Sequence, residues 1–418
     1  MNERLLQYIW QYKYYNSADL RTTDNLPLQI IHPGTYNTNQ GPDFINARIC
    51  FENKVWAGSI EIHIKASEWK AHNHSNDENY NNVILHVVWQ QDVETFLPFP
   101  TLPLHDRISM LLINRYEELM QSPLFIPCQQ HIRVNELIIN SWKQRLLIER
   151  LQQRATNIEF LLKTNNNNWE ETFWVMLARN FGMKVNGEAF ENIAGSVSIN
   201  IILKQHQLIQ VEALLFGQAG LLDRKFKDSY PNRLRKEYIF LQKKYNLVKI
   251  PYSLFFLRMR PSNFPTLRLA QLAVLINNNK NLFSVVRDMN GIKELEEVLN
   301  ITANEYWHYH YTFDDQISFC KKKLGAEMIK NVLINTFIPI LYQYGYFCNN
   351  EKYKVKALYW MESLSKENNS ITKGFEALGV ENRNAADSQS LIQLKNEYCN
   401  YKKCLSCAIG NNILKNNF

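Results

Sequence analysis

The sequence predicts an α+β protein in which a strand-rich N-terminal part precedes a large α-helical region. Short runs of β-branched and apolar residues recur between residues 28 and 89. From about residue 135, apolar residues recur at helical spacing instead. The chain has 418 residues, 45% of them hydrophobic and only 13 of them proline, which is enough for two or three domains with a large core.

The N-terminal part is expected to begin with a helix and to continue with four strands. Apolar residues recur at helical spacing within residues 1–20, at Leu5, Leu6, Ile9 and Trp10. Strands are expected at residues 28–31, 47–51, 55–66 and 83–89. The last run is continuously apolar, which is typical of a strand buried on both faces. Residues 67–82 are polar and rich in histidine, and the strand region is expected to end at Pro98, Pro100 and Pro103.

The helical region shows its periodicity most clearly in two places. One amphipathic helix is marked by Leu147, Leu151, Ile158 and Leu162, and another by Leu269, Leu272, Ala273 and Ile276. The Asn run at 165–168 is expected to form a solvated turn between helices, and Gly217 and Gly220 to mark a helix end. A linker is expected at residues 124–128, so we divide the chain into domains at 1–125 and 126–418.

Bulk properties set limits on location and partners. The formal net charge is +7 and the pI is about 8.8, a mild excess that is compatible with nucleic acid but is also common in other enzymes. We expect a cytoplasmic protein with no membrane partner, because no signal-peptide pattern or apolar run of about eighteen residues is present. Seven cysteines, an odd number, favour thiols or a metal over a disulfide framework.

Acidic and basic side chains on the third strand predict a metal site. Glu61, His63 and Lys65 alternate with apolar residues and therefore share one face of that strand. Asp43 stands just before the preceding strand, so a hairpin would bring it close to Glu61. Two carboxylates in an apolar sheet repel each other unless a cation lies between them, and oxygen ligands suit Mg²⁺ or Mn²⁺. The alternative is a sheet whose acids simply form hydrogen bonds and salt bridges.

The histidines of this region allow a rival interpretation. His63, His72, His74 and Asp77 offer ligands that suit Zn²⁺, which would imply a zinc-dependent hydrolase or a structural zinc site. Three of these residues lie in the polar segment 67–82, where histidines are often only solvated.

The cysteines near the C-terminus form a second candidate metal site. Cys399, Cys404 and Cys407 have the spacing C-x4-C-x2-C, and C-x2-C is common in metal sites. A fourth ligand would come from elsewhere: Cys128 and Cys348 are the candidates, and Cys128 is the favoured choice. The bound species would be Zn²⁺ or an iron–sulfur cluster. A reduced thiol cluster without metal is the alternative.

A basic loop is a candidate for contact with nucleic acid. Arg258, Arg260 and Arg268 lie among prolines and Phe264, where they could meet phosphates. The bland alternative is a helix N-terminus with solvated arginines.

The acidic pattern resembles that of the PD-(D/E)xK, or restriction-endonuclease-like, nucleases. The resemblance implies an αβββαβ core that binds Mg²⁺ or Mn²⁺ and hydrolyses DNA. It makes Pro42-Asp43 the PD element and Glu61 the second metal ligand. His63 stands where the family has lysine, and Lys65 lies one alternation further along the same face. Glu3 on the first helix matches an additional ligand that some members use.

Over nearly its full length the chain resembles an uncharacterised bacterial family, domain of unknown function 2851. The resemblance is carried by G-P-D-F at 41–44, W-A-G-S-I-E-I-H at 56–63, R-P-S-N-F-P-T-L-R at 260–268 and the C-terminal cysteine segment. That family implies no activity. We therefore expect a metal-dependent nuclease-like protein that hydrolyses DNA. The alternatives are a non-enzymatic nucleic-acid-binding or scaffold protein with an inactive nuclease fold, and the zinc-dependent hydrolase.

Overall fold

The computed structural model describes residues 1–94, 97–132, 135–248 and 254–415. The chain folds into two compact units. The first unit comprises residues 1–142 together with the returning segment 394–418, and the second comprises residues 143–393. The division expected from the sequence, at residues 125 and 126, did not anticipate this return.

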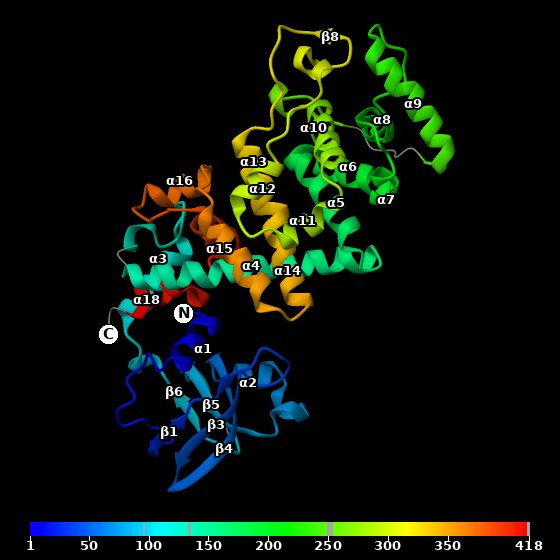
Figure 1. Cartoon of the computed structure of the whole chain (residues 1–418). Coiled ribbons are helices and arrows are strands. Elements are labelled where there is room, and N and C mark those ends of the chain that lie inside the picture. Colours follow the sequence, from blue (N-terminus) through cyan, green and yellow to red (C-terminus); the bar gives the residue numbers. More distant parts are fainter. Residues whose placement is uncertain (95–96, 133–134, 249–253, 416–418) are drawn as a thin grey trace. The chain divides into compact units, whose positions relative to one another are not determined.

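A mixed sheet forms the first unit (Figure 1). Among the described residues it has six strands, β1 Leu28–His32, β2 Thr35–Tyr36, β3 Phe44–Phe51, β4 Lys54–Lys65, β5 Val83–Gln90 and β6 Thr101–Pro103. Strand β3 pairs antiparallel with β1, β2 and β4, whereas β4–β5 and β5–β6 are parallel. Parallel strands need a crossover, and residues 66–82 supply it between β4 and β5.

The four strands expected from the sequence are all present, and two short ones were missed. Strand β6 contains Pro103, although the prolines were expected to end the strand region. Proline is tolerated in this strand because β6 lies at the edge of the sheet and pairs only with β5. Strand β2 has only two residues, too few to give an alternating pattern.

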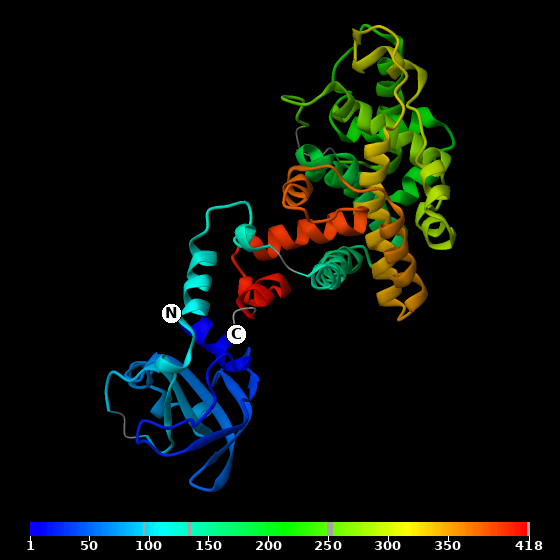
Figure 2. The same cartoon turned by 90° about the vertical axis from the view of Figure 1, so that its left-hand side faces the viewer.

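Among the described residues, four α-helices lie wholly in the first unit, and two of them, α1 and α2, pack on the sheet. The four helices are α1 Glu3–Gln11, α2 Glu68–Ala71, α3 Met110–Gln121 and α18 Ala408–Lys415. The expected opening helix is α1, in which Leu5, Leu6, Ile9 and Trp10 are fully buried. The Asn2 side chain accepts a hydrogen bond from the Leu5 N–H at 2.9 Å and so caps this helix. Helix α1 packs against β4, and α18 packs against α3 (Figures 1 and 2).

The second unit is mainly helical. It contains most of α4 Glu136–Thr164 and the helices α5 Trp169–Phe181, α6 Met183–Ser196, α7 Ile199–Leu203, α8 Leu208–Gln218, α9 Ser229–Tyr245, α10 Pro265–Asn278, α11 Leu282–Asp288, α12 Ile292–Val298, α13 Ala326–Val332, α14 Ile338–Phe347, α15 Glu351–Ser363, α16 Ser370–Glu376 and α17 Ala385–Gln393. A small hairpin of β7 His310–Thr312 and β8 Asp315–Gln316 is added to them.

The helices expected in this unit from periodicity are α4 and α10. The Asn run forms the expected turn, in which Asn166 and Asn167 have left-handed backbones and Asn168 caps α5. Helix α8 ends at Gln218, and Gly220 adopts a φ of +69° just beyond it, as the glycine pattern predicted.

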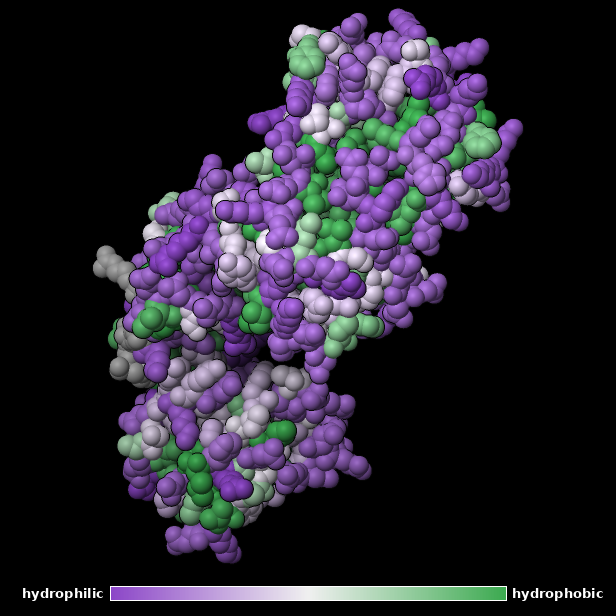
Figure 3. Space-filling view, in the orientation of Figure 1, coloured by the Kyte–Doolittle hydropathy of each residue, from purple (hydrophilic) through white to green (hydrophobic). Residues whose placement is uncertain are grey.

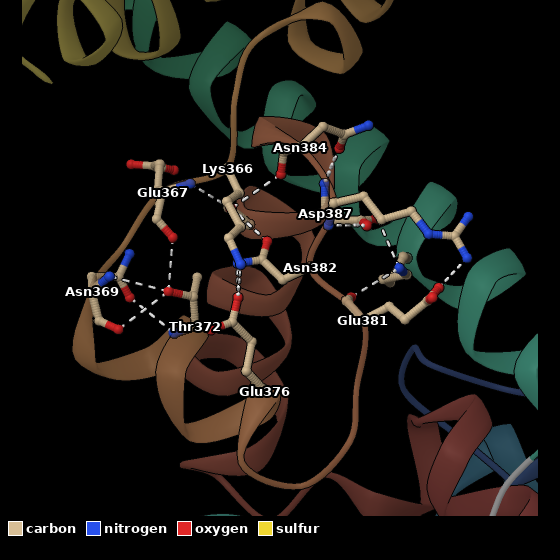
Figure 4. A network of polar contacts seen from close by, with 12 residues as sticks. Lys366, Glu367, Asn369, Thr372, Glu376, Glu381, Asn382, Asn384 and Asp387 are labelled. Carbon is tan, nitrogen blue, oxygen red and sulfur yellow. Dashed lines mark hydrogen bonds and ion pairs between the residues drawn. The ribbon is translucent and has the colours of Figure 1, made fainter. Parts of the chain in front are cut away.

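Polar contacts hold the segment between α15 and α17 (Figure 4). Lys366 Nζ lies 2.8 Å from the Glu376 carboxylate, which also accepts a hydrogen bond from the Asn382 amide at 3.0 Å. The Asn369 side chain caps α16 by accepting from the N–H groups of Ile371 and Thr372. Side-chain contacts therefore hold this segment, together with an isolated antiparallel bridge between Ser365 and Asn384.

Exposed hydrophobic residues lie over the antiparallel strands of the first unit (Figure 3). Among them are Ile31, Ile45 and Val55. Among the described helices, none is long and apolar enough to cross a membrane.

Candidate metal centre

The hairpin of β3 and β4 brings Asp43 and Glu61 together. Asp43 immediately precedes β3, and the first residue of that strand, Phe44, pairs with Ile60. The backbone N–H of Asp43 donates to Glu61 Oε2 at 3.0 Å. In return, the Ile62 N–H donates to Asp43 Oδ2 at 3.1 Å. The two acids are thus fixed side by side by the main chain.

Helix α1 adds a further acid through a bridging amide. Gln7 Nε2 donates to Asp43 Oδ1 at 2.8 Å and lies 3.2 Å from Glu3 Oε1. Glu3 and Gln7 are four residues apart, so they share one face of the helix. The Tyr36 hydroxyl completes the contacts of Gln7 at 3.4 Å. Glu3, expected from family resemblance, therefore lies at the edge of the site.

Three imidazoles converge on the other side of Glu61. His63 Nε2 lies 3.1 Å from His72 Nδ1 and 3.3 Å from His74 Nε2. Glu61 Oε1 lies 3.5 Å from His63 Nε2 and 3.4 Å from His74 Nε2. His63 comes from β4, whereas His72 and His74 come from the crossover that the parallel pairing of β4 and β5 requires. His72 is exposed, so the cluster opens to solvent on that side.

His86 fixes the orientation of His63. It is fully buried on β5, directly opposite Glu61 in the parallel register. His86 Nε2 contacts His63 Nδ1 at 2.9 Å. Because the partner of one ring nitrogen determines the role of the other, this contact leaves His63 Nε2 facing Glu61, His72 and His74.

Burial shifts the ionisation of these groups toward their neutral forms. It raises the pKa of Asp43 to about 6, with a contribution from Glu3. Burial and the charge of Asp43 raise the pKa of Glu61 to about 9. Burial and the neighbouring His86 lower the pKa of His63 to about 3, and burial lowers the pKa of His86 to about 4. At neutral pH His63 and His86 keep their lone pairs, and a cation would favour the ionised carboxylates.

The spacing of the donor atoms fits one metal ion. Two ligands bound to Zn²⁺ at 2.0–2.1 Å in a tetrahedron are about 3.4 Å apart. The measured separations at His63 Nε2, from 3.1 to 3.5 Å, bracket that value. The ligand nitrogens of His63, His72 and His74 all lie within 4.8 Å of one another. A neutral imidazole nitrogen makes one hydrogen bond, so three polar neighbours at this atom exceed what hydrogen bonding satisfies.

Two expected members are not among the donors that meet at His63 Nε2. Lys65 is exposed, and within the described part of the chain no hydrogen bond or ion pair joins its ammonium to Asp43 or Glu61. The Asp77 carboxylate accepts hydrogen bonds from the backbone and side chain of Asn79 and so caps a short helical turn. The roles expected for Lys65 in water activation and for Asp77 in zinc binding receive no geometric support.

The three arginines expected to contact nucleic acid in the second unit differ in their exposure to solvent. Arg258 and Arg260 are exposed. Arg268 is buried in α10, and its guanidinium donates to Gln271 Oε1 at 2.9 Å and Asn263 Oδ1 at 2.7 Å. Burial keeps Arg268 from phosphates in solution, so its contribution is to hold the start of α10.

Sequence reasoning missed three residues of the centre. Gln7 lies on the buried face of α1 among Leu6, Tyr8 and Ile9, where a polar residue indicates a specific polar partner. His86 interrupts an apolar strand and indicates the same. Tyr80 stacks on His74 with ring centroids 3.9 Å apart, and no pattern in the polar crossover marks it.

The cysteines converge as a separate group. Cys128, Cys399, Cys404 and Cys407 line one small cavity within the first unit.

Comparison with known proteins gives one relationship. No curated protein and no solved structure matches the chain significantly. The model of a family described as protein of unknown function, DUF2851, matches residues 3–370, which include the whole His and acid cluster. The chain therefore belongs to the DUF2851 family of proteins of unknown function.

Proposed function

We propose that the first unit is a metal-dependent hydrolase that cleaves phosphodiester bonds in DNA. One observation carries the proposal: His72, His74 and Glu61 all direct a donor atom at His63 Nε2, within 3.5 Å of it. Buried polar groups that exceed their hydrogen-bonding capacity are typical of ion sites.

The order of elements supports the nuclease class of this proposal. Helix α1, strands β1, β3 and β4, helix α2 and strand β5 occur in the order of the αβββαβ core that the PD-(D/E)xK resemblance implies, with the two-residue strand β2 inserted between β1 and β3. Asp43 precedes the second of these strands, and Glu61 lies on the third, as that resemblance requires. Helix α2 is only one turn long, so the second helix of the core is much reduced.

The donor set indicates which ion is held. Imidazole nitrogens suit Zn²⁺ or Mn²⁺ better than Mg²⁺, and the Glu61 carboxylate is compatible with all three. His63, His72, His74 and Glu61 would hold the ion. When bound, the metal would polarise a phosphoryl oxygen and lower the pKa of a coordinated water.

The remaining residues have supporting roles. Asp43 fixes Glu61 through its backbone N–H and is itself held by Gln7. Glu3 adds negative charge at the side of the site formed by α1. His86 keeps His63 Nδ1 engaged, so that Nε2 is the nitrogen offered to the ion. The exposed edge at His72 is the side from which a phosphodiester would approach.

Cleavage assays with matched variants test the proposal. The wild-type protein is incubated with single-stranded, double-stranded and branched DNA in Mg²⁺, Mn²⁺ or Zn²⁺. We expect cleavage with at least one ion, and losses of about 100-fold or more in His63→Ala and Glu61→Gln, each of which removes a proposed ligand. Glu78→Gln, on the exposed turn after Asp77, is the control and should retain activity.

Inactivity of the wild-type protein on all three DNA forms, with every ion, would refute the nuclease proposal. Stoichiometric metal in that inactive protein would instead favour the scaffold alternative, in which four protein ligands close a structural site.

A zinc-dependent hydrolase of another substrate class is the second candidate. The observation that favours it is the mutual proximity, within 4.8 Å, of the ligand nitrogens of His63, His72 and His74. Hydrolysis of generic ester or amide substrates that depends on Zn²⁺, with no cleavage of DNA, would select this candidate over the nuclease.

A further inference from the structure

A cavity of about 810 Å³ lies within the second unit, among α4, α5, α6 and the residues that precede and begin α14. Small-molecule sites in proteins usually measure about 300–1,000 Å³ and combine an apolar lining with a few polar groups. This cavity has such a lining, because Arg154, Asn180 and Asn335 share it with Leu161 and Met176. Its size and its lining therefore suit a small organic molecule.

Arg154 has hydrogen-bonding capacity left over for a ligand. It is half-buried on α4, and within the described part of the chain its guanidinium bonds only neutral oxygens. Nη1 donates to the Ile334 carbonyl at 2.8 Å, whereas Nη2 donates to Asn335 Oδ1 at 2.7 Å and to Gln389 Oε1 at 3.2 Å. A guanidinium has five N–H groups, so two of them remain for a further partner.

The positive charge of Arg154 is offset only indirectly. Burial and the neighbouring Arg150 lower the pKa of Arg154, and Glu367 acts in the opposite sense. Glu367 is linked to Arg154 through the Gln389 amide, which accepts from the guanidinium and donates to the Glu367 carboxylate. An anion in direct contact with the two remaining N–H groups would stabilise the charged guanidinium.

The charged side chains of the cavity also favour an anion. Among the described residues, three cations and two acids line it, which leaves one positive charge in excess. Arg179 and Glu191 form an ion pair with each other. Lys184 and Glu188 lie on the same helix, α6, and both are exposed. The guanidinium of Arg154 and the ammonium of Lys184 are thus the cationic groups available to a ligand.

Two backbone irregularities occur in the wall of this cavity. Residues Leu333–Phe337 form one π-helical turn, which presents the Ile334 carbonyl and the Asn335 side chain to Arg154. Met183, between α5 and α6, has a left-handed backbone with a φ of +53° although its side chain is bulky. Both kinds of irregularity cost stability and occur preferentially at functional sites. Their presence here favours a binding site over simple helix packing.

The apolar part of the lining extends to the protein surface. Phe160 on α4 is 70% exposed, and Val185 on α6 is 52% exposed. Met176 on α5 is half-buried beside the same cavity. An apolar or aromatic body placed against these side chains would remove them from water, and the Phe160 ring offers a face for stacking.

We propose that this cavity binds a small amphipathic anion, a phosphate monoester or a carboxylate with an apolar or aromatic body. Arg154 and Lys184 hold the anionic group, and Phe160, Met176 and Val185 contact the body. The cavity is made of different residues from the candidate metal centre, so the proposal does not depend on the function proposed for that centre.

Calorimetric titration of the full-length protein tests the proposal. EDTA is present, so that phosphate bound to a metal ion in the first unit does not contribute. The ligands are naphthyl phosphate and naphthoate, with neutral naphthol of the same ring isomer and inorganic phosphate as matched controls. We expect one molecule of at least one naphthyl anion to bind per chain, at least about 10-fold more tightly than either control. The tighter of the two anions identifies the ligand as a phosphate monoester or a carboxylate.

Exposed residues of the cavity provide variants that preserve the fold. Phe160→Ala and Lys184→Gln should each weaken binding of the tighter anion by at least about 3-fold. Phe240→Ala and Lys236→Gln remove exposed side chains of α9 outside the cavity and should leave the affinity unchanged.

Arg154→Gln should weaken binding of the tighter anion most, and the two exposed variants decide the question if Arg154→Gln fails to fold. Three results would overturn the proposal. These are wild-type protein that binds neither naphthyl anion, naphthol that binds as tightly as the anions, and unchanged affinity in both Phe160→Ala and Lys184→Gln.

Discussion

Replacing Glu61 by glutamine should stabilise the metal-free protein, and the gain should grow with pH. The amide oxygen of the new side chain can still accept the hydrogen bond from the Asp43 N–H, so the fold around it is retained. The wild-type carboxyl has a folded-state pKa of about 9, raised by burial and by Asp43, against an unfolded value near 4.5. Between these values the folded state holds one proton more than the unfolded state, so stability is lost as pH rises.

The size of the effect follows from proton linkage. One proton contributes about 1.4 kcal/mol of unfolding free energy per pH unit. Below pH 6.5 the buried histidines act in the opposite sense: His63 and His86 have lowered folded-state pKa values and gain stability as pH rises toward 6.5. Between pH 6.5 and 8.5, therefore, the advantage of Glu61→Gln over wild type should widen by about 3 kcal/mol.

Urea unfolding of chelator-treated proteins, followed by tryptophan fluorescence, measures this difference. Because the unfolding free energies of wild type and variant are compared at each pH, the contributions of the titrating groups that both proteins share cancel in the difference. Glu52→Gln, on the exposed turn between β3 and β4, is the matched control and should give a flat difference. A flat difference for Glu61→Gln as well would refute the argument that Glu61 is buried in its protonated form. Added Mn²⁺ or Zn²⁺ should stabilise wild type more than Glu61→Gln.

Three further predictions concern the metal centre and the second unit. His72→Ala removes a proposed donor and should weaken binding of Zn²⁺ or Mn²⁺ by at least about 10-fold in calorimetry. The control His105→Ala removes an exposed imidazole outside the cluster and should leave the affinity unchanged. Equal affinities of the two variants would exclude His72 as a ligand. Gly217→Ala would place a Cβ 2.1 Å from the Tyr238 ring and should lower the urea stability of the second unit by about 1–3 kcal/mol. Gly195→Ala meets nothing within 4 Å in α6 and should raise it by about 0.5–1 kcal/mol, so a loss there would contradict the packing argument.

Local patterning was sufficient to predict the main strands of the first unit. Strands β3, β4 and β5 carry continuous or alternating apolar runs, and their burial follows those runs. The pattern cannot specify which strands pair or in which direction, because those choices depend on contacts between distant residues. The return of residues 394–418 to the first unit is of this kind, since it depends on Lys395 and Lys402 meeting carbonyls some 270 residues earlier.

The candidate metal centre was predictable only in part, for a similar reason. The alternation along β4 placed Glu61 and His63 on one face, and the hairpin placed Asp43 beside them. The same alternation suggested Lys65, but β4 ends there and the side chain is exposed to solvent. His72 and His74 lie in a polar crossover without periodicity. Their approach to His63 follows from the parallel pairing of β4 with β5, and the sequence pattern cannot predict that pairing.

The histidine cluster and the cysteine cavity of the first unit follow one physical logic. In each, four protein groups that bind cations are brought together in a largely buried space, and in each burial shifts the pKa values toward the uncharged forms. A chain under selection for stability alone would replace such groups by apolar ones, because buried polar groups are costly without partners. Fixed main-chain contacts, such as the Asp43 N–H on Glu61 and the Gly410 backbone beside Cys404, instead hold these groups in place. An arrangement that costs stability when empty, and is nevertheless held in place by the backbone, is what we expect if the proposed ions bind there and restore the lost free energy.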